Sequence, residues 1–180
     1  MIPLVGPAMA GAALLALAGA LKLLDPTMTV GALHRLGLPS GPLLVRSGAG
    51  AELALGVLAI VVGGGIWWLV AASYLAFSVF VGLALGRRSP IGSCGCFGRA
   101  DTPPRPRHLV LNLLLAAWAV AAARALDGSV LDELERRPAG GALAVVAAAV
   151  LLVVLHAVYT QPGPDVLTPA PVAPSETTPT

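Results

Sequence analysis

The sequence predicts an all-α protein that crosses a membrane several times. Hydrophobic residues make up 57% of the 180-residue chain and charged residues only 11%, whereas a soluble domain carries roughly a quarter charged residues. Five apolar runs reach the length of about twenty residues that spans a bilayer core as a helix. The runs are rich in Ala and Leu and do not alternate between apolar and polar residues, which favours helices over barrel strands.

The predicted spans end where helix-breaking residues and charges begin. They cover residues 3–24, 44–62, 66–86, 107–126 and 141–159. The first lacks a positively charged leading region and is longer than the apolar part of a signal peptide, so we expect a retained helix. Asp25-Pro26 ends it, because proline disfavours helical geometry in the residue before it. Gly63-Gly64-Gly65 makes a tight turn, so the second and third spans should be antiparallel neighbours.

The remaining segments are predicted from their composition. Residues 28–36 could form a short interfacial helix with His34 on its polar face, and residues 127–140 form a loop. Trp67 and Trp68 sit where an interfacial aromatic belt is expected. A transmembrane domain over residues 1–160 is therefore followed by a tail, residues 161–180, whose Pro- and Thr-rich composition predicts disorder.

The small residues Gly82 and Gly86, four positions apart in the third span, predict close helix packing.

One carboxylate interrupts the apolar second span. Glu52 lies about two turns from Arg46, and a carboxylate at that depth usually faces the bundle interior or a polar cavity. It could instead sit near the interface, paired with Lys22 or Arg46 for structure alone. Gly48 and Gly56 share its helix face at a spacing of four residues, which would bring the acid against a neighbouring helix.

The only two cysteines, Cys94 and Cys96, flank Gly95 in a polar break between spans. Residues two apart reach disulfide distance only if the chain bends, and glycine permits such a bend. The resulting ring would be strained, and strained disulfides tend to be labile or catalytic. Arginines and the start of the next helix would lower the pKa of the thiols. These arginines are Arg87, Arg88, Arg99, Arg105 and Arg107.

Other interpretations of the cysteines stay open. A zinc site requires four ligands, and the chain adds only His34, His108 and His156, which lie on separate segments; a Cys-x-Cys pair also resembles a soft copper(I) site. The two thiols could also pack as small hydrophobic side chains, but their spacing and the neighbouring arginines favour redox chemistry. No basic run is interleaved with aromatic residues, so we expect no nucleic-acid partner.

Several of these features together resemble the MauE family of DoxX-like, redox-associated membrane proteins. The resemblance covers roughly residues 1–126, and the string Cys94-Gly95-Cys96-Phe97-Gly98 is its most specific part. The other matching features are Lys22-Leu23-Leu24-Asp25-Pro26, Glu52, Arg107-His108 and Asn112. In this chain Arg107 and Asn112 are separated, whereas the family usually has an arginine directly before an asparagine.

The resemblance implies a four-helix transmembrane bundle, to which this chain adds a fifth span. It also implies that Cys94 and Cys96 form the redox pair, with Lys22, Glu52, Arg107 and Asn112 as supporting polar residues.

By resemblance, the partner would be a thioredoxin-like or disulfide-containing protein, and the role would be maturation of the disulfide-rich small subunit of methylamine dehydrogenase. Quinone as an electron acceptor follows from fold analogy alone, and no metal is assigned. Alternatives are a non-catalytic assembly or stabilising subunit and a metal-handling protein.

The expected location is the plasma (inner) membrane, where the chain would be a multi-pass protein in contact with the lipid bilayer. Two observations point to opposite sides for the cysteine loop. The arginine-rich face that carries it indicates the cytoplasmic side, whereas a disulfide donor would act on the oxidising outer face.

Overall fold

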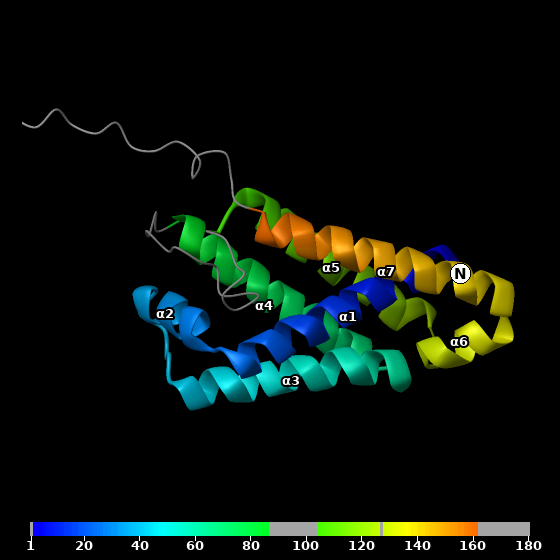
Figure 1. The fold of residues 1–180 in the computed structure, drawn as a ribbon, viewed down its shortest axis with the longest axis horizontal. Helices are drawn as coiled ribbons and strands as arrows, with labels where there is room; N and C mark the ends of the chain where they lie inside the picture. Colours follow the sequence, from blue (N-terminus) through cyan, green and yellow to red (C-terminus); the bar gives the residue numbers. More distant parts are fainter. Residues whose placement is uncertain (1, 87–103, 127, 162–180) are drawn as a thin grey trace, which may run out of the picture.

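The computed structural model describes residues 2–86, 104–126 and 128–161, and every regular element within these ranges is a helix (Figure 1). Five of the helices are long and apolar enough to cross a membrane. The all-helical, five-span prediction is therefore confirmed. The helices are α1 (Ile2–Leu24), α2 (Thr27–Arg35), α3 (Pro42–Val61), α4 (Ile66–Gly86), α5 (Pro106–Ala125), α6 (Val130–Arg136) and α7 (Pro138–Thr160).

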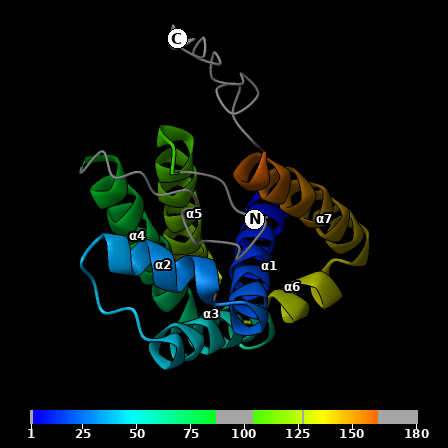
Figure 2. The ribbon, with the colours of Figure 1, turned by 60° about the vertical axis from the view of Figure 1, so that its left-hand side comes forward.

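The first helix, α1, is the centre of the bundle. It packs against α3, α7 and α5, and α4 packs mainly against α5 (Figure 2). In its most apolar stretch 56% of the residues are buried, compared with 22% in α3 and in α7. The outer helices therefore present most of their apolar side chains outward, as expected of helices whose solvent is lipid.

Glycines set the close contact between α1 and α3. A Cβ atom added to Gly19 would lie 2.5 Å from the backbone oxygen of Ala49 and 2.6 Å from the backbone nitrogen of Leu53. One added to Gly56 would lie 2.7 Å from the backbone nitrogen of Ala16. The predicted packing role holds for Gly56, because small residues let helix backbones approach closely in membranes.

Other expectations about glycine packing, and the one about Trp67, were wrong. An added Cβ on Gly48, Gly82 or Gly86 would meet no described atom within 4 Å, so these glycines are not packed closely against the described helices. Trp67 is fully buried in the core and does not belong to an interfacial belt. Trp68 is exposed, and the guanidinium carbon of Arg124 lies 5.8 Å from its ring centroid.

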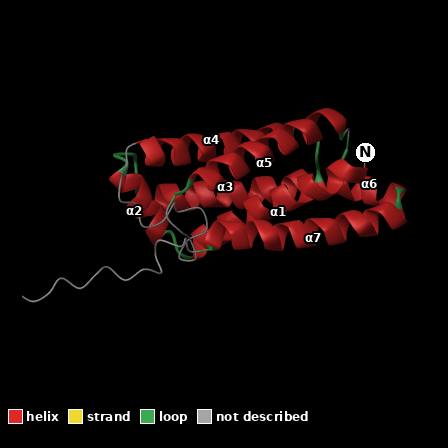
Figure 3. Cartoon of the chain, turned by 90° about the horizontal axis from the view of Figure 1, so that it is seen from above, coloured by secondary structure: helices red, strands yellow, loops and turns green. Residues whose placement is uncertain are grey.

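Two short helices cover opposite ends of the bundle (Figure 3). The predicted interfacial helix exists as α2, which packs Ala32 and Leu36 against Phe80 and Ala84 of α4. Its His34 is exposed, as expected. This apolar contact holds α2 over the ends of α3 and α4.

The second short helix, α6, replaces part of the loop that we predicted. Its first turn has a capping box, in which the Asp132 backbone N–H donates to Ser129 Oγ over 3.0 Å and the Ser129 backbone N–H donates to Asp132 Oδ2 over 3.1 Å. Hydrogen bonding with the Ser129 side chain, and then with its backbone, lowers the pKa of the Asp132 carboxyl. The Ser-x-x-Asp spacing was the sequence signal for this helix start.

Candidate functional site at the α2 end of the bundle

Cys94 and Cys96 lie outside the described residues, in the segment that joins the end of α4 to the start of α5. The last residue of α4, Gly86, and the first of α5, Pro106, are both at the α2 end of the bundle (Figure 1). The segment that carries the two cysteines is therefore tethered at both of its ends to this part of the molecule. Two clusters of polar side chains lie at the same end of the bundle.

An ion pair joins α1 to α3 near the α2 end of the bundle. Lys22 Nζ lies 2.5 Å from Glu52 Oε2, and the two side chains are only 4% and 15% exposed. Helical side chains lean toward the N-terminus of their own helix. Because α1 and α3 run antiparallel, Lys22 and Glu52 lean toward each other. The interior position expected for Glu52 and its pairing with Lys22 are thus both present, whereas Arg46 is exposed.

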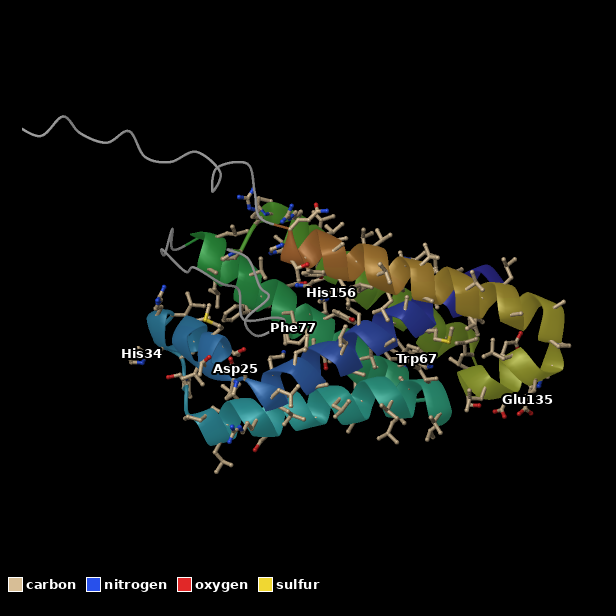
Figure 4. The ribbon with its side chains drawn as sticks, in the orientation of Figure 1. Asp25, His34, Trp67, Phe77, Glu135 and His156 are labelled. Carbon is tan, nitrogen blue, oxygen red and sulfur yellow. The ribbon has the colours of Figure 1, made fainter. Side chains whose placement is uncertain are left out.

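An aromatic ring of α4 completes the surroundings of this ion pair. Lys22 Nζ lies 4.9 Å from the ring centroid of Phe77, within the range of a cation–π contact. Phe77 in turn meets Tyr74 edge to face, with ring centroids 6.1 Å apart. Figure 4 shows Phe77 directed from α4 into the interior of the bundle. The ammonium group is therefore held by a carboxylate and a ring face from two different helices.

A pocket of about 510 Å³ opens beside the ion pair. Its walls come from α2, α3 and α4, with Lys22 at the end of α1. Apart from Lys22 and Glu52, its lining is almost entirely apolar, with Thr29 of α2 as the other polar side chain. The volume falls within the roughly 300–1,000 Å³ typical of small-molecule sites, which also combine apolar walls with a few polar groups.

A second polar cluster lies at the start of α5, the helix that follows the cysteine segment. The Tyr159 hydroxyl of α7 donates to Asn112 Oδ1 over 2.7 Å. The His108 ring stacks on Tyr159, with ring centroids 5.3 Å apart. All three side chains are buried. The cluster therefore fixes the end of α7 against the beginning of α5.

Arg107 lies at the edge of this cluster, where its Nε donates to His108 Nε2 over 3.4 Å. Its Nη2 donates to the backbone oxygen of Gln161 over 2.7 Å. Arg107 and Asn112 are five positions apart, which at about 100° per residue separates them by about 140° around the helix. The spacing that departs from the family pattern thus places Asn112 inside the bundle and leaves Arg107 half-buried at its end.

Two polar atoms of the cluster are buried without a hydrogen-bond partner among the described residues: His108 Nδ1 and Asn112 Nδ2. Asn112 and Tyr159 also line a small cavity of about 10 Å³ together with Tyr74 and Phe77. A space of this size is close to the minimum that holds one water molecule. Phe77 lines both this cavity and the large pocket.

The predicted supporting residues therefore form two groups. Lys22 and Glu52 contact each other beside the large pocket, whereas Asn112 belongs to the α5–α7 cluster and Arg107 contacts His108 of that cluster. We did not predict that Phe77 and Tyr159 belong to these groups. A tyrosine or phenylalanine in an apolar span is typical of packing or of the interface, so no sequence signal distinguished them. His108 was visible beside Arg107, but its burial was not.

No cluster of three or more His, Cys, Asp or Glu side chains that could hold a metal ion is found within residues 2–86, 104–126 and 128–161. The three histidines lie on α2, α5 and α7. His34 points outward from α2, and His156 lies on α7 (Figure 4).

Comparisons with known proteins place these observations in a family. A search of curated proteins and a search of solved structures each gave no match. A family model described as methylamine utilisation protein MauE matches residues 2–125, which include α1 to α5 and the cysteine segment. The match covers more than half of the chain, so this five-span membrane protein belongs to the MauE family.

Proposed function

We propose that this chain is a membrane thiol–disulfide redox protein in which Cys94 and Cys96 are the reacting pair. The proposed substrate is a disulfide-containing partner protein whose maturation belongs to methylamine utilisation. The observation that carries the proposal is the family match over the segment holding both cysteines. Their Cys-Gly-Cys spacing supports it, because a strained ring makes a disulfide labile.

The proposed exchange conserves atoms and electrons. A partner thiolate attacks one sulfur of the Cys94–Cys96 disulfide, that bond breaks, and a mixed disulfide forms while the other cysteine leaves as a thiolate. The partner's second thiolate then attacks the partner sulfur of the mixed disulfide, that bond breaks, and the cysteine of this chain leaves as a thiolate. The partner gains a disulfide, and Cys94 and Cys96 gain the two electrons. The same steps in reverse reduce a partner disulfide.

Positive charges that follow the cysteines in the sequence, at the start of α5, support the proposal. Arg105 precedes the helix and Arg107 lies in its first turn, and cations and helix N-termini both lower the pKa of a nearby thiol. Asn112 would act less directly, by holding α5 against Tyr159 of α7. We assign Lys22 and Glu52 a similar positioning role, because their ion pair fixes α1 against α3.

Mixed-disulfide trapping tests the proposal. Cells producing Cys94→Ser or Cys96→Ser should accumulate a covalent adduct between this chain and its partner, visible on a non-reducing gel and lost with a reductant. The adduct forms because the remaining cysteine lacks the second thiol needed to resolve it. Ser93→Ala is the matched control, since it changes a neighbouring side chain and leaves both thiols.

Maturation of the partner gives the second readout. In both cysteine variants the disulfide content of the methylamine dehydrogenase small subunit should fall, while the amount of this chain in the membrane stays constant. Normal disulfide content and no adduct in both variants would contradict the redox function. That result would favour the non-catalytic assembly role, for which the cysteines are dispensable.

A further inference from the structure

The large pocket at the α2 end opens sideways between two helices. The tight turn at residues 62–65 joins α3 to α4, and from there the two helices diverge toward α2 (Figure 1). Leu44, Val79 and Leu83 line the pocket and are also exposed on the outside of α3 and α4. These outer faces belong to membrane-spanning helices, so the opening faces the bilayer.

The short helix α2 closes the pocket toward the aqueous end. Thr29 and Leu33 of α2 line it, while Ala32 and Leu36 attach α2 to α4. A molecule that occupies the pocket therefore has direct access from the lipid phase, and α2 lies between it and the membrane surface. Such a site selects a ligand that dissolves in the bilayer.

The polar end of the pocket defines the head of that ligand. Lys22 and Glu52 form an ion pair with no net charge, and Lys22 is 3% exposed. An ammonium has three hydrogen-bond donors and a carboxylate has about four acceptor positions, so each retains capacity beyond their mutual contact. A charged head group would leave an uncompensated charge in this apolar site, which is costly.

We propose that this pocket binds a neutral membrane amphiphile whose head carries a hydroxyl group. The hydroxyl oxygen accepts a hydrogen bond from Lys22, the hydroxyl hydrogen is donated to Glu52, and the apolar chain lies between α3 and α4. A hydroxyl is the small neutral group that matches both members of the ion pair at once. The inference rests on the pocket and the ion pair alone and does not require the cysteines to be redox-active.

Photolabelling of the full-length protein in phospholipid nanodiscs tests the proposal. Three hexadecyl probes with a diazirine in the chain differ only in the head: hydroxyl, carboxylate or trimethylammonium. Labelled peptides are mapped by mass spectrometry. The hydroxyl probe should label the pocket segments of α2 and α4 about tenfold more than either charged probe, the difference given by one hydrogen bond to a charged group.

Two glycines of α3 provide a matched pair of variants. Gly48 lines the pocket, and an added Cβ there would meet no atom within 4 Å. Gly50 is equally open to an added Cβ but does not line the pocket. Gly48→Leu should fill the site and abolish the preferential labelling, whereas Gly50→Leu should leave it unchanged.

A double variant separates the head group from the cavity. Lys22→Met with Glu52→Leu removes both polar partners of the hydroxyl together, so labelling by the hydroxyl probe should fall about tenfold, while the two charged probes should remain disfavoured. Unlabelled diacylglycerol and a prenylated hydroquinone, added as competitors, then distinguish two natural sources of the hydroxyl. The class of lipid that binds in the cell should reduce labelling by the hydroxyl probe. Equal labelling by all three heads, or unchanged labelling in Gly48→Leu, would overturn the proposal and indicate ordinary bilayer contact only.

Discussion

At the scale of single residues, the Lys22–Glu52 ion pair is the most consequential feature of the described structure. Both side chains are removed from water within the spans of α1 and α3. A charge in such a place is tolerated when it is paired. Each charge is neutralised by the other, so removing one member of the pair should destabilise the protein more than removing both.

Stability measurements on the pair should show this coupling. Glu52→Leu leaves the Lys22 ammonium buried without its carboxylate and should destabilise the protein by about 3–5 kcal/mol. Adding Lys22→Met to Glu52→Leu should recover much of the loss, because replacing a whole buried pair by apolar residues is often close to neutral. Thermal unfolding in nanodiscs measures both variants, with exposed Arg46→Met as the control. Additive effects of the two substitutions would contradict the coupling.

The sequence identified both members of this pair but not their geometry. Glu52 stood out because a carboxylate is rare within an apolar span, and Lys22 stood out at the end of one. That Lys22, and not Arg46, is the partner depends on the antiparallel register of α1 and α3. Phe77 and Tyr159 were not identified because an aromatic residue in an apolar span has the same appearance whether it faces lipid, core or a polar group.

At the scale of elements, the contact between α1 and α3 depends on small residues. Gly19 and Gly56 bring the two backbones so close that an added Cβ would touch backbone atoms of the facing helix. Backbone atoms cannot move aside as the end of a flexible side chain does, so any larger residue must push the helices apart. The register that brings Lys22 to Glu52 is consequently sensitive to both positions.

Substitution of the glycines should separate packing from helix propensity. Gly19→Ala or Gly56→Ala should lower stability by about 1–3 kcal/mol, the usual cost of overpacking. Gly82→Ala on α4, which meets no described atom within 4 Å, should be neutral or stabilising by up to about 1 kcal/mol, because alanine is the better helix former. Thermal unfolding measures all three. Equal effects at Gly19 and Gly82 would show that close packing is not the determining factor.

At the scale of the whole molecule, the five spans put α2 and α6 at opposite ends of the bundle (Figure 3). The cysteine segment is attached to the α2 end through α4 and α5. The connection between α2 and α3, which includes Ser40, is at the same end. Glu135 of α6 is exposed at the other end (Figure 4).

Thiol labelling in intact cells should reveal this arrangement. With Cys94 and Cys96 replaced by serine, Ser40→Cys and Glu135→Cys should react with a membrane-impermeant reagent from opposite sides. In the unsubstituted chain, reduced Cys94 and Cys96 should follow the pattern of Ser40→Cys. This comparison decides which side of the membrane carries the cysteines. Labelling of Ser40→Cys and Glu135→Cys from the same side would contradict the five-span topology.

The sequence by itself determined the fold class, the approximate spans and the residues with unusual chemistry. It could do so because a bilayer requires each spanning backbone to satisfy its own hydrogen bonds, so apolar length is enough to predict a helix. Only the tertiary structure decided that Lys22 meets Glu52, that Asn112 meets Tyr159 and that a pocket opens between α3 and α4. These features depend on how neighbouring helices are rotated and shifted against each other, which contacts between distant segments determine.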